Sequence, residues 1–284
     1  MEKYCVLYNP YAGGGTAKTS AEKLNELFKG DTVVYKDMTA IGNYSEFFAT
    51  LASDEKLIIA GGDGTINRFI NDINGIELDR DLYYYAVGSG NDFLRDLGEQ
   101  LGTKPICITP YIKNLPTVTV KGKDYKFING VGYGIDGYCC EVGDQLRETS
   151  DKPVNYAGIA IKGLLFHYKP TNATIIVDGK KYELKKVWIA PTMKGRFYGG
   201  GMMPTPKQDR LDPERKLSLM IFYGSGKLKT LMVFPSLFKG EHVKHEKIIK
   251  ILKGSEITVK FDQPTALQID GETILGVTEY TAKI

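Results

Sequence analysis

The stretch LIIAGGDGTINRFINDI, residues 57–73, changes its pattern halfway and decides how the first part of the chain folds. Its first four residues, Leu57 to Ala60, are apolar and predict a short buried strand. Its second half carries apolar residues at helical spacing, namely Ile66, Phe69, Ile70 and Ile73. The glycines between them allow a sharp turn and a close approach to the backbone. A helix that opens at Thr65 offers unpaired N–H groups and partial positive charge, which together favour binding of a phosphate group.

The same order of strand, glycine turn and helix occurs on both sides of this stretch. Before it, YCVLYN leads into NPYAGGGTAK and then into a helical pattern formed by Ala21, Leu24, Leu27 and Phe28. After it, LYYYAVGSGNDFLRDLG repeats the order. A strand in DTVVYKD and a helix from about Tyr44 to Leu51 lie between. This alternation predicts a parallel sheet covered by helices, with a ligand beyond the carboxyl ends of the strands, where the glycine turns lie.

From about Thr117 the pattern changes to short β-rich segments separated by Gly-Lys, Asp-Gly or Gly-Ser turns. These segments predict antiparallel strands, with one helical insert near Asn155 to Tyr168. We therefore expect an α/β fold of two domains with a cleft between them. Residues 1–116 form a Rossmann-like nucleotide-binding domain, and residues 117–284 form a β-rich antiparallel sandwich whose last segment can return to the first domain.

Composition limits the classes of protein to consider. The 284 residues are 42% hydrophobic and 25% charged, which is typical of a globular protein. The 37 Lys and Arg residues nearly balance the 34 Asp and Glu residues, so a nucleic-acid partner is not expected. The cysteine spacing predicts neither a disulfide framework nor a zinc site. No signal peptide is evident, and no apolar run approaches the roughly 20 residues that cross a bilayer. We expect a cytoplasmic protein that can act at the inner membrane surface, and a homodimer is left open.

Two common nucleotide signatures are absent. The sequence has no GxxxxGK[ST] loop, and GSGNDF does not complete GxGxxG. A P-loop ATPase and an ordinary dinucleotide oxidoreductase are therefore both disfavoured. A single glycine turn is most often only a turn, but three in succession at one end of a sheet indicate a ligand site.

Seven motifs occur in order along nearly the whole chain: NP…GGG, GGDGT, GSGNDF, NGVGYGIDG, GGGMMPTP, SLFKGEH and IDGE. Together they resemble the diacylglycerol kinase and sphingosine kinase family of lipid kinases, and most of all its compact bacterial diacylglycerol kinase type. GGDGT is shared with NAD kinases, whereas GSGNDF and the late DGE are typical of the lipid kinases. The resemblance implies ATP- and Mg²⁺-dependent transfer of the γ-phosphate to a lipid hydroxyl at the membrane surface, with diacylglycerol as the first candidate acceptor.

The resemblance also implies which residues contact the nucleotide: Asn9, Gly13, Gly14, Gly61, Gly62, Asp63, Gly64, Thr65, Ser89 and Asn91. Phosphoryl transfer depends mainly on positioning and on neutralising phosphate charge. The N–H groups of Gly61, Gly62 and Gly64 can donate to phosphate oxygens, and Thr65 adds a hydroxyl. Asp63 is either a ligand of the magnesium ion that bridges the phosphates or only a brace of the turn.

A lipid hydroxyl needs a base that takes its proton as the new bond to phosphorus forms. The resemblance implies that Asp270 is this base and that Glu272 is its orienting or metal-linked partner. Alternation along a strand is expected to place both side chains on one face. The alternative is that Asp270 and Gly271 form only a hairpin turn, as VDGKK at residues 177–181 is expected to do.

The chain departs from the family pattern at two places. Arg215 stands in DRLDPERK where glycine is usual, after an aspartate that can hold a second, structural magnesium ion, and Asp212 or Glu214 could substitute as its ligand. Lys194 stands where asparagine is common. This lysine either favours a more anionic substrate or points to solvent, so the preferred headgroup is left open.

The stretch LMVFPSLFKGEHVKHEKIIKILKG, residues 231–254, combines apolar and basic residues. It predicts either a surface that sits on an anionic bilayer or a buried core with a solvated lysine face. Three rival functions also remain open. They are a kinase for a sphingoid base or another lipid alcohol, an NAD kinase, and an inactive nucleotide- or lipid-binding regulator. The NAD kinase is disfavoured because its usual Asn-Glu pair occurs here only at Asn25-Glu26, on the first predicted helix.

Overall fold

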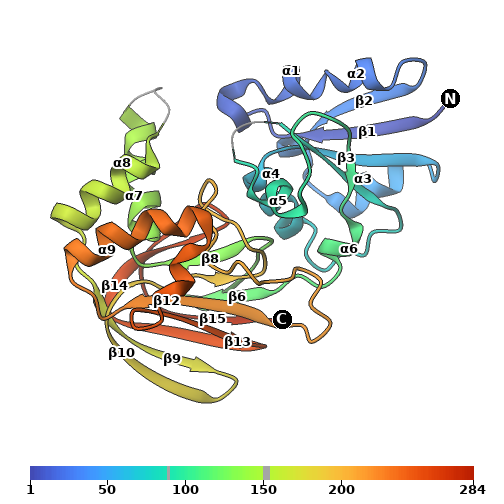
Figure 1. Cartoon of the computed structure of the whole chain (residues 1–284). Helices are drawn as coiled ribbons and strands as arrows, with labels where there is room; N and C mark the ends of the chain where they lie inside the picture. Colours follow the sequence, from blue (N-terminus) through green and yellow to red (C-terminus); the bar gives the residue numbers. More distant parts are fainter. Residues whose placement is uncertain (88–89, 150–153) are drawn as a thin grey trace. The chain divides into compact units, whose positions relative to one another are not determined.

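The computed structural model describes residues 1–87, 90–149 and 154–284. The chain divides into two compact units, Met1–Leu115 and Pro116–Ile284 (Figure 1). The first is an α/β unit and the second is rich in antiparallel strands, so the expected fold class is confirmed. Within the described residues, no helix is both long and apolar enough to cross a membrane.

The first unit alternates strands with short helices. In chain order its elements are β1 (Lys3–Tyr8), η1 (Ala12–Gly15), α1 (Ala17–Ala21), α2 (Leu24–Leu27), β2 (Thr32–Asp37), η2 (Met38–Ala40), α3 (Tyr44–Thr50), β3 (Glu55–Gly61), α4 (Asp63–Asp72), β4 (Leu82–Ala86), α5 (Asp92–Leu97), β5 (Ile106–Cys107) and α6 (Thr109–Ile112).

The five strands of this unit form one sheet in the order β2-β1-β3-β4-β5. All neighbours are parallel except β4 and β5. The apolar run in β3 is buried because one face packs on Leu24 of α2 while helices cover the other. The strand order reverses between β1 and β3, and such a switch point is where open α/β sheets bind ligands. The turns after β1, β3 and β4 all lie at the carboxyl ends of these parallel strands.

Two helices of the first unit differ from the prediction. The helix after β3 begins at Asp63, two residues before Thr65, with Gly62 in extended conformation as its N-cap. The expected first helix is broken into α1 and α2 at Glu22 and Lys23. This break changes the helical phase, so Leu27 leaves the buried face and is 48% exposed. The buried face of α4, with Ile66, Phe69, Ile70 and Ile73, is confirmed.

The second unit contains most of the strands. Its elements are β6 (Thr117–Val120), β7 (Lys123–Lys126), β8 (Gly130–Tyr133), α7 (Ile135–Thr149), α8 (Tyr156–Lys162), η3 (Gly163–His167), β9 (Thr171–Val177), β10 (Lys180–Ile189), β11 (Thr192–Met193), β12 (Leu217–Tyr223), α9 (Lys227–Val233), η4 (Phe234–Lys239), η5 (Glu241–Lys244), β13 (Ile249–Gly254), β14 (Glu256–Ile269) and β15 (Glu272–Lys283).

The ten strands of this unit pair in the order β7-β6-β15-β14-β8-β11-β12-β10-β9, with β13 beside β12. The long strand β14 closes the sheet, because Ile257–Phe261 pair with β9 while Leu267–Ile269 pair with β8. The inward side chains of the closed sheet form one apolar core. The last strand, β15, pairs with β14 and β6, so the final segment belongs to the sheet of this unit.

The longest helix, α7, is absent from the prediction, which placed only one helical insert near Asn155 to Tyr168. Its glycines lower helix propensity, but close packing requires them. A Cβ atom on Gly137 would lie 1.9 Å from the carbonyl oxygen of Ala266, and one on Gly143 would lie 2.7 Å from the ring of Tyr156. The helix therefore packs directly on β14 at the cost of a weaker sequence signal.

Candidate active site

The turn between β3 and α4 is packed so closely that two of its glycines are obligatory. A Cβ atom on Gly61 would lie 2.2 Å from Oγ1 of Thr65, and one on Gly62 would lie 2.7 Å from the carbonyl oxygen of Gly90. Thr65 is only 3% exposed and covers Gly61. The fold itself therefore requires these two glycines, whether or not a ligand binds.

Gly64 differs from the other glycines of this turn. It is exposed at the start of α4, and a Cβ atom built there meets no atom within 4 Å. A glycine in a helix costs about 1 kcal/mol relative to alanine, and nothing in the packing of the unit requires this one. The first turn of α4 is thus left open for a ligand to approach its backbone.

Asp63 links the turns after β3 and β4. Its Oδ2 accepts the N–H of Asp92 at 2.6 Å, its Oδ1 accepts the N–H of Phe93 at 3.2 Å, and its own N–H donates to Gly90 at 2.9 Å. The carboxylate is buried and caps the N-terminus of α5. The brace, which was one of the two roles predicted for Asp63, is therefore present.

A buried tyrosine that was not among the predicted site residues connects the same two turns. The Tyr84 hydroxyl donates to the carbonyl oxygen of Gly61 at 2.9 Å and lies 3.2 Å from Oδ1 of Asn91. Burial raises the pKa of Tyr84 well above its usual value, so the hydroxyl stays protonated as a donor. A tyrosine inside a buried strand needs such a partner, and this need is the signal that could have indicated it.

The turn after β1 has a local hydrogen-bond pattern of its own. Oδ1 of Asn9 accepts the N–H of Tyr11 at 3.1 Å, and the Asn9 carbonyl oxygen accepts the N–H of Ala12 at 3.0 Å. Gly13 and Gly14 lie in η1, which directly precedes α1. Asn9 directly follows β1, and Asn91 is the N-cap of α5, whereas Ser89 lies outside the described residues.

In the second unit, Asp270 and Gly271 form a two-residue hairpin turn between β14 and β15. Both have positive φ, 48° and 102°, and Ile269 pairs with Glu272 across the turn. The expectation that strand alternation places Asp270 and Glu272 on one face is therefore wrong. Glu272 begins β15 and is exposed. The turn geometry favours the hairpin alternative for the backbone, and the side chain of Asp270 decides whether the turn does more.

The Asp270 carboxylate accepts three backbone N–H groups. Oδ2 accepts from Ile128 at 2.6 Å, and Oδ1 accepts from Asn129 at 2.8 Å and from Gly130 at 2.9 Å. The Asp270 N–H in turn donates to the carbonyl oxygen of Gly130 at 3.1 Å. These bonds fix the carboxylate against the start of β8, far more firmly than an ordinary hairpin turn requires.

Two basic residues complete this part of the second unit. Arg210 is buried and donates to the carbonyl oxygen of Ile128 and to Oδ1 of Asn129, each at 2.5 Å. The backbone N–H of Lys194 donates to the carbonyl oxygen of Asn129 at 2.9 Å. Lys194 is only 6% exposed, so the alternative that it points to solvent is wrong. Burial and the nearby Arg210 and Arg215 lower the pKa of Lys194. Within the described part of the chain, its ammonium has no hydrogen-bond or ion-pair partner.

Comparison with known proteins agrees with these two halves. The diacylglycerol kinase catalytic domain model matches residues 3–117, and the model for the YegS C-terminal NAD kinase beta sandwich-like domain matches residues 129–283. The chain belongs to the diacylglycerol kinase family of lipid kinases. It is a kinase, as its relatives are named.

Relatives and solved structures cover nearly the whole of this lipid kinase. It is 25% identical to diacylglycerol kinase from Bacillus subtilis (strain 168), over 96% of this chain and 90% of that protein. It is 23% identical to diacylglycerol kinase from Mycobacterium tuberculosis (strain ATCC 25618 / H37Rv), over 87% and 81%. A crystal structure of a diacylglycerol kinase from Bacillus anthracis str. Sterne matches with a TM-score of 0.61 at 20% identity, covering 99% of this chain and 93% of that one. The structural match shows the shared fold.

The two remaining candidate metal ligands, Asp212 and Glu214, each lie beside a lysine. Oδ1 of Asp212 accepts the N–H of Glu214 at 2.9 Å, and Oδ2 lies 3.9 Å from Nζ of Lys253. The exposed carboxylate of Glu214 pairs with Lys216 at 3.1 Å. No group of three or more His, Cys, Asp or Glu residues that could hold a metal occurs among the described residues. A second, structural magnesium ion at Asp212 or Glu214 therefore gains no support from the side chains.

The kinase also buries a carboxylate that the sequence did not single out. Oδ2 of Asp136 accepts the Tyr198 hydroxyl at 3.0 Å, whereas its buried Oδ1 has no partner in the described residues. Burial raises the pKa of Asp136 from its usual 3.8 to about 6, against the opposing hydrogen bonds. A Cβ atom on Gly132 would lie 1.8 Å from Oδ2 of Asp136, so this position requires glycine.

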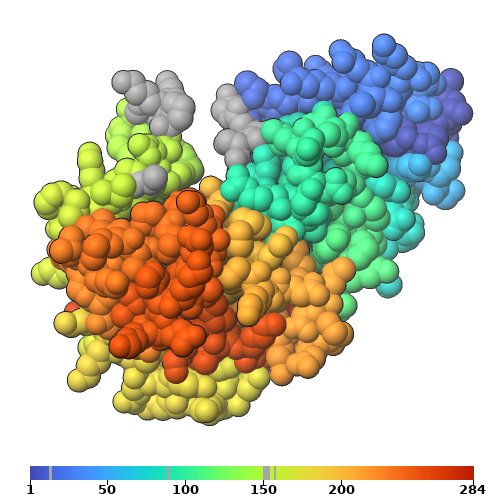
Figure 2. All heavy atoms as spheres, viewed as in Figure 1, coloured from blue at the N-terminus to red at the C-terminus, as the bar shows by residue number. Residues whose placement is uncertain are grey.

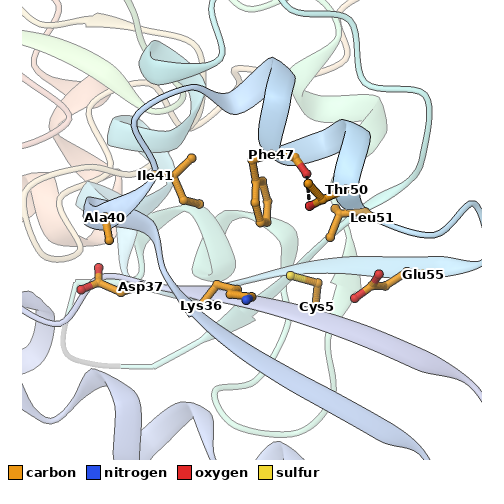
Figure 3. A pocket seen from close by; sticks show the side chains of 9 residues that line it. All are labelled: Cys5, Lys36, Asp37, Ala40, Ile41, Phe47, Thr50, Leu51 and Glu55. Atoms are coloured by element: carbon orange, nitrogen blue, oxygen red, sulfur yellow. Dashed lines mark hydrogen bonds between the residues drawn. The ribbon is translucent and has the colours of Figure 1, made fainter.

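A cavity of about 370 Å³ lies in the first unit between the sheet and α3 (Figure 3). Its lining residues are Cys5, Lys36, Asp37, Ala40, Ile41, Phe47, Thr50, Leu51 and Glu55. None of the predicted site residues lines it. Burial raises the pKa of the Cys5 thiol to about 12, so the thiol stays neutral and is a poor nucleophile.

Proposed function

We propose that this kinase transfers the γ-phosphate of ATP to a lipid hydroxyl in a magnesium-dependent reaction, with diacylglycerol as acceptor and phosphatidic acid as product. The observation that supports the nucleotide half best is the exposed, unpacked Gly64 at the start of α4. It lies at the switch point of the sheet, between the turns that carry Asn9 and Asn91. Backbone N–H groups in such a place suit phosphate oxygens.

Asp63 is the residue proposed to hold the magnesium ion. At phosphate sites magnesium takes only one or two protein carboxylates and is otherwise bound by substrate phosphates and water. Asp63 fits this need in type and in position, because it directly precedes Gly64. When bound, the ion would neutralise phosphate charge. The cap that Asp63 gives α5 keeps its carboxylate in one orientation for this role.

Asp270 is the proposed base in the acceptor half. The lipid oxygen forms its bond to the γ-phosphorus as the bond from that phosphorus to the β–γ bridging oxygen breaks. The lipid hydroxyl proton passes to the Asp270 carboxylate, and ADP leaves. The three N–H groups that Asp270 accepts fix the carboxylate beforehand, and a base held in position loses less entropy in the reaction.

The buried charges near Asp270 favour diacylglycerol over the rival sphingoid base. Lys194 and Arg210 are both buried and both flank Asn129, whose N–H binds Asp270. A sphingoid base carries an ammonium group, which two buried cations would repel. Diacylglycerol is uncharged and meets no such repulsion. The asparagine that the family commonly has at position 194 would lack this discrimination.

A radiolabelled phosphate-transfer assay tests the proposal. The enzyme is incubated with γ-labelled ATP, magnesium and one acceptor at a time: diacylglycerol, monoacylglycerol, sphingosine, undecaprenol or NAD. Asp270→Asn is the test variant, because asparagine tolerates the positive φ at this position. Glu279→Gln, an exposed carboxylate on β15, is the matched control. Thermal unfolding of each variant checks that the asparagine amide, which opposes a backbone N–H, has not unfolded the turn.

We expect label in diacylglycerol with wild type and Glu279→Gln, and none with a folded Asp270→Asn. Label in sphingosine alone would contradict the acceptor, and label in NAD alone would contradict lipid transfer altogether. Full activity of Asp270→Asn would remove Asp270 as the base. Nucleotide binding without transfer to any acceptor would favour the inactive regulator.

A further inference from the structure

The helices α8, η3 and α9 of the second unit share one core. Ile159 and Leu164 from the first two and Val233 from α9 are buried in the same apolar cluster, beside Trp188. The Lys227 ammonium donates to the carbonyl oxygen of Leu165 at 2.9 Å, which ties the two segments together. Figure 2 shows the yellow-green atoms of α8 and η3 next to the orange atoms of α9 on one face. The outer sides of these helices form a continuous surface.

This outer surface is apolar. Phe166, Leu228 and Met232 are 71%, 72% and 63% exposed. Leu228 and Met232 are four residues apart and therefore lie on one face of α9. The α8–α9 patch is defined here by its exposed apolar side chains, Ile161, Leu165, Phe166, Leu228 and Met232. Clustered exposure of this kind marks an interaction site, whereas single exposed apolar residues do not.

The two chain segments that carry the α8–α9 patch bear charge of only one sign. Residues 154–170 and 224–240 contain five lysines and no Asp or Glu: Lys162, Lys169, Lys227, Lys229 and Lys239. All five are exposed. In the described part of the chain, none of the five makes an ion pair. This contrasts with the chain as a whole, which has 37 basic and 34 acidic residues.

The patch and its lysines share only Met232 and Lys239 with residues 231–254, where the sequence suggested a membrane surface. Of that stretch, Val233, Phe234 and Leu237 are buried in the core, as the alternative expected. Lys244 pairs with Glu241 at 3.4 Å, and Lys253 lies 3.9 Å from Asp212. The surface with both apolar and unpaired basic side chains instead joins α9 to the distant segment α8–η3.

We propose that the α8–α9 patch docks the protein on an anionic lipid surface. Apolar side chains that enter the headgroup region, ringed by lysines that face anionic headgroups, match the two interactions that hold amphipathic helices at a bilayer. The apolar and the basic side chains both belong to the second unit. Docking does not depend on the proposed catalysis.

Vesicle co-sedimentation tests this proposal with the full chain. Vesicles of phosphatidylcholine alone are compared with vesicles of equal parts phosphatidylcholine and phosphatidylglycerol. The apolar variant is Phe166→Ser/Leu228→Ser/Met232→Ser, and the charge variant is Lys162→Gln/Lys169→Gln/Lys229→Gln. The matched control, Ile176→Ser/Leu275→Ser, removes exposed apolar side chains from β9 and β15. Because every changed residue is exposed, we expect all variants to fold.

We expect wild type and the control to bind anionic vesicles and to release them as salt rises. The apolar and charge variants should each bind at least about tenfold more weakly. Equal binding by wild type and both patch variants would overturn the proposal, as would no binding by wild type or an equal loss in the control. A wild type that binds an acidic protein but no vesicle would also overturn it.

Phosphate transfer to acceptor dispersed in detergent micelles separates this proposal from the proposed function. The patch variants should keep wild-type activity there, since no patch residue belongs to the catalytic machinery. Vesicle binding without transfer to any acceptor would contradict the kinase reaction alone. Transfer in micelles without patch-dependent vesicle binding would contradict docking alone.

Discussion

Replacing Gly64 with alanine should make the protein more stable and its nucleotide binding weaker. Gly64 is exposed, lies within α4, and has no atom within 4 Å of a built Cβ. Alanine is better than glycine in a helix by up to about 1 kcal/mol. For a unit of this size, such a gain raises the melting temperature by a few degrees, about 4 to 8 °C per kcal/mol at most.

The same substitution at Gly61 should have the opposite effect on stability. Its Cβ would lie 2.2, 2.4 and 2.6 Å from three side-chain atoms of Thr65. Thr65 is fixed in α4 and is buried, so it cannot rotate away into solvent. Overpacking of this kind costs about 1 to 3 kcal/mol. Gly61→Ala is therefore the matched variant that separates a glycine required by the fold from one kept for a ligand.

Thermal unfolding without nucleotide and titration calorimetry with ATP and magnesium check both variants. The methyl group of Gly64→Ala occupies the space where a phosphate oxygen is proposed to lie. We expect at least about tenfold weaker binding, equivalent to about 1.4 kcal/mol, together with the raised melting temperature. An unchanged affinity would refute the assignment of this turn to the nucleotide. A lowered melting temperature would refute the argument that Gly64 has no role in packing.

Two further predictions concern buried carboxylates. Asp63→Asn places an amide donor against one of the N–H groups that cap α5, so denaturant unfolding should show a loss of about 1 to 3 kcal/mol; no loss would contradict the cap. Asp136→Asn should stabilise the protein at pH 7 by up to about 3 kcal/mol, because folding raises the pKa of Asp136 from 3.8 to about 6 and the buried charge is costly. Below pH 6 the folded carboxyl gains its proton before the unfolded one does, so the stability of wild type should rise and the advantage of the variant should disappear by about pH 4; a constant difference between melting curves at pH 7 and pH 4 would contradict this.

The α/β unit could be predicted from the sequence because its signals are local. An apolar run of four residues, a glycine turn and a helical repeat lie within residues 57–73, and each signal depends only on its neighbours. The exact start of α4 was missed because Asp63 is held by Gly90 and by Asp92, which follow about thirty residues later. The sequence also did not distinguish the glycine that the packing requires from the glycine that it does not. In the folded protein, Gly61 packs against Thr65, whereas a Cβ atom on Gly64 would meet no atom within 4 Å.

The second unit depends on contacts between distant residues, and local patterns carry little of this information. Asp270 binds the N–H groups of residues 128–130, which are about 140 positions earlier in the chain, and Arg210 binds the same segment from about 80 positions away. The motif DGE indicated the turn but not these partners. Helix α7 was missed for a related reason, since Gly137 serves a contact with β14 that no local rule describes.

The two departures from the family pattern now carry different weight. Arg215 has a φ of 51°, so its backbone adopts the left-handed conformation for which glycine is usual there. This conformation is less favourable for arginine, because its Cβ atom crowds the backbone. That departure keeps a backbone conformation that glycine also adopts. Lys194 instead carries a positive charge where the common asparagine is neutral, and it lies buried beside Arg210. A change of charge inside a buried site alters which ligands can bind, whereas a change in a loop that keeps its conformation does not. The acceptor preference of this kinase should therefore be set by Lys194, and the neutral Lys194→Asn variant should accept a sphingoid base that wild type rejects.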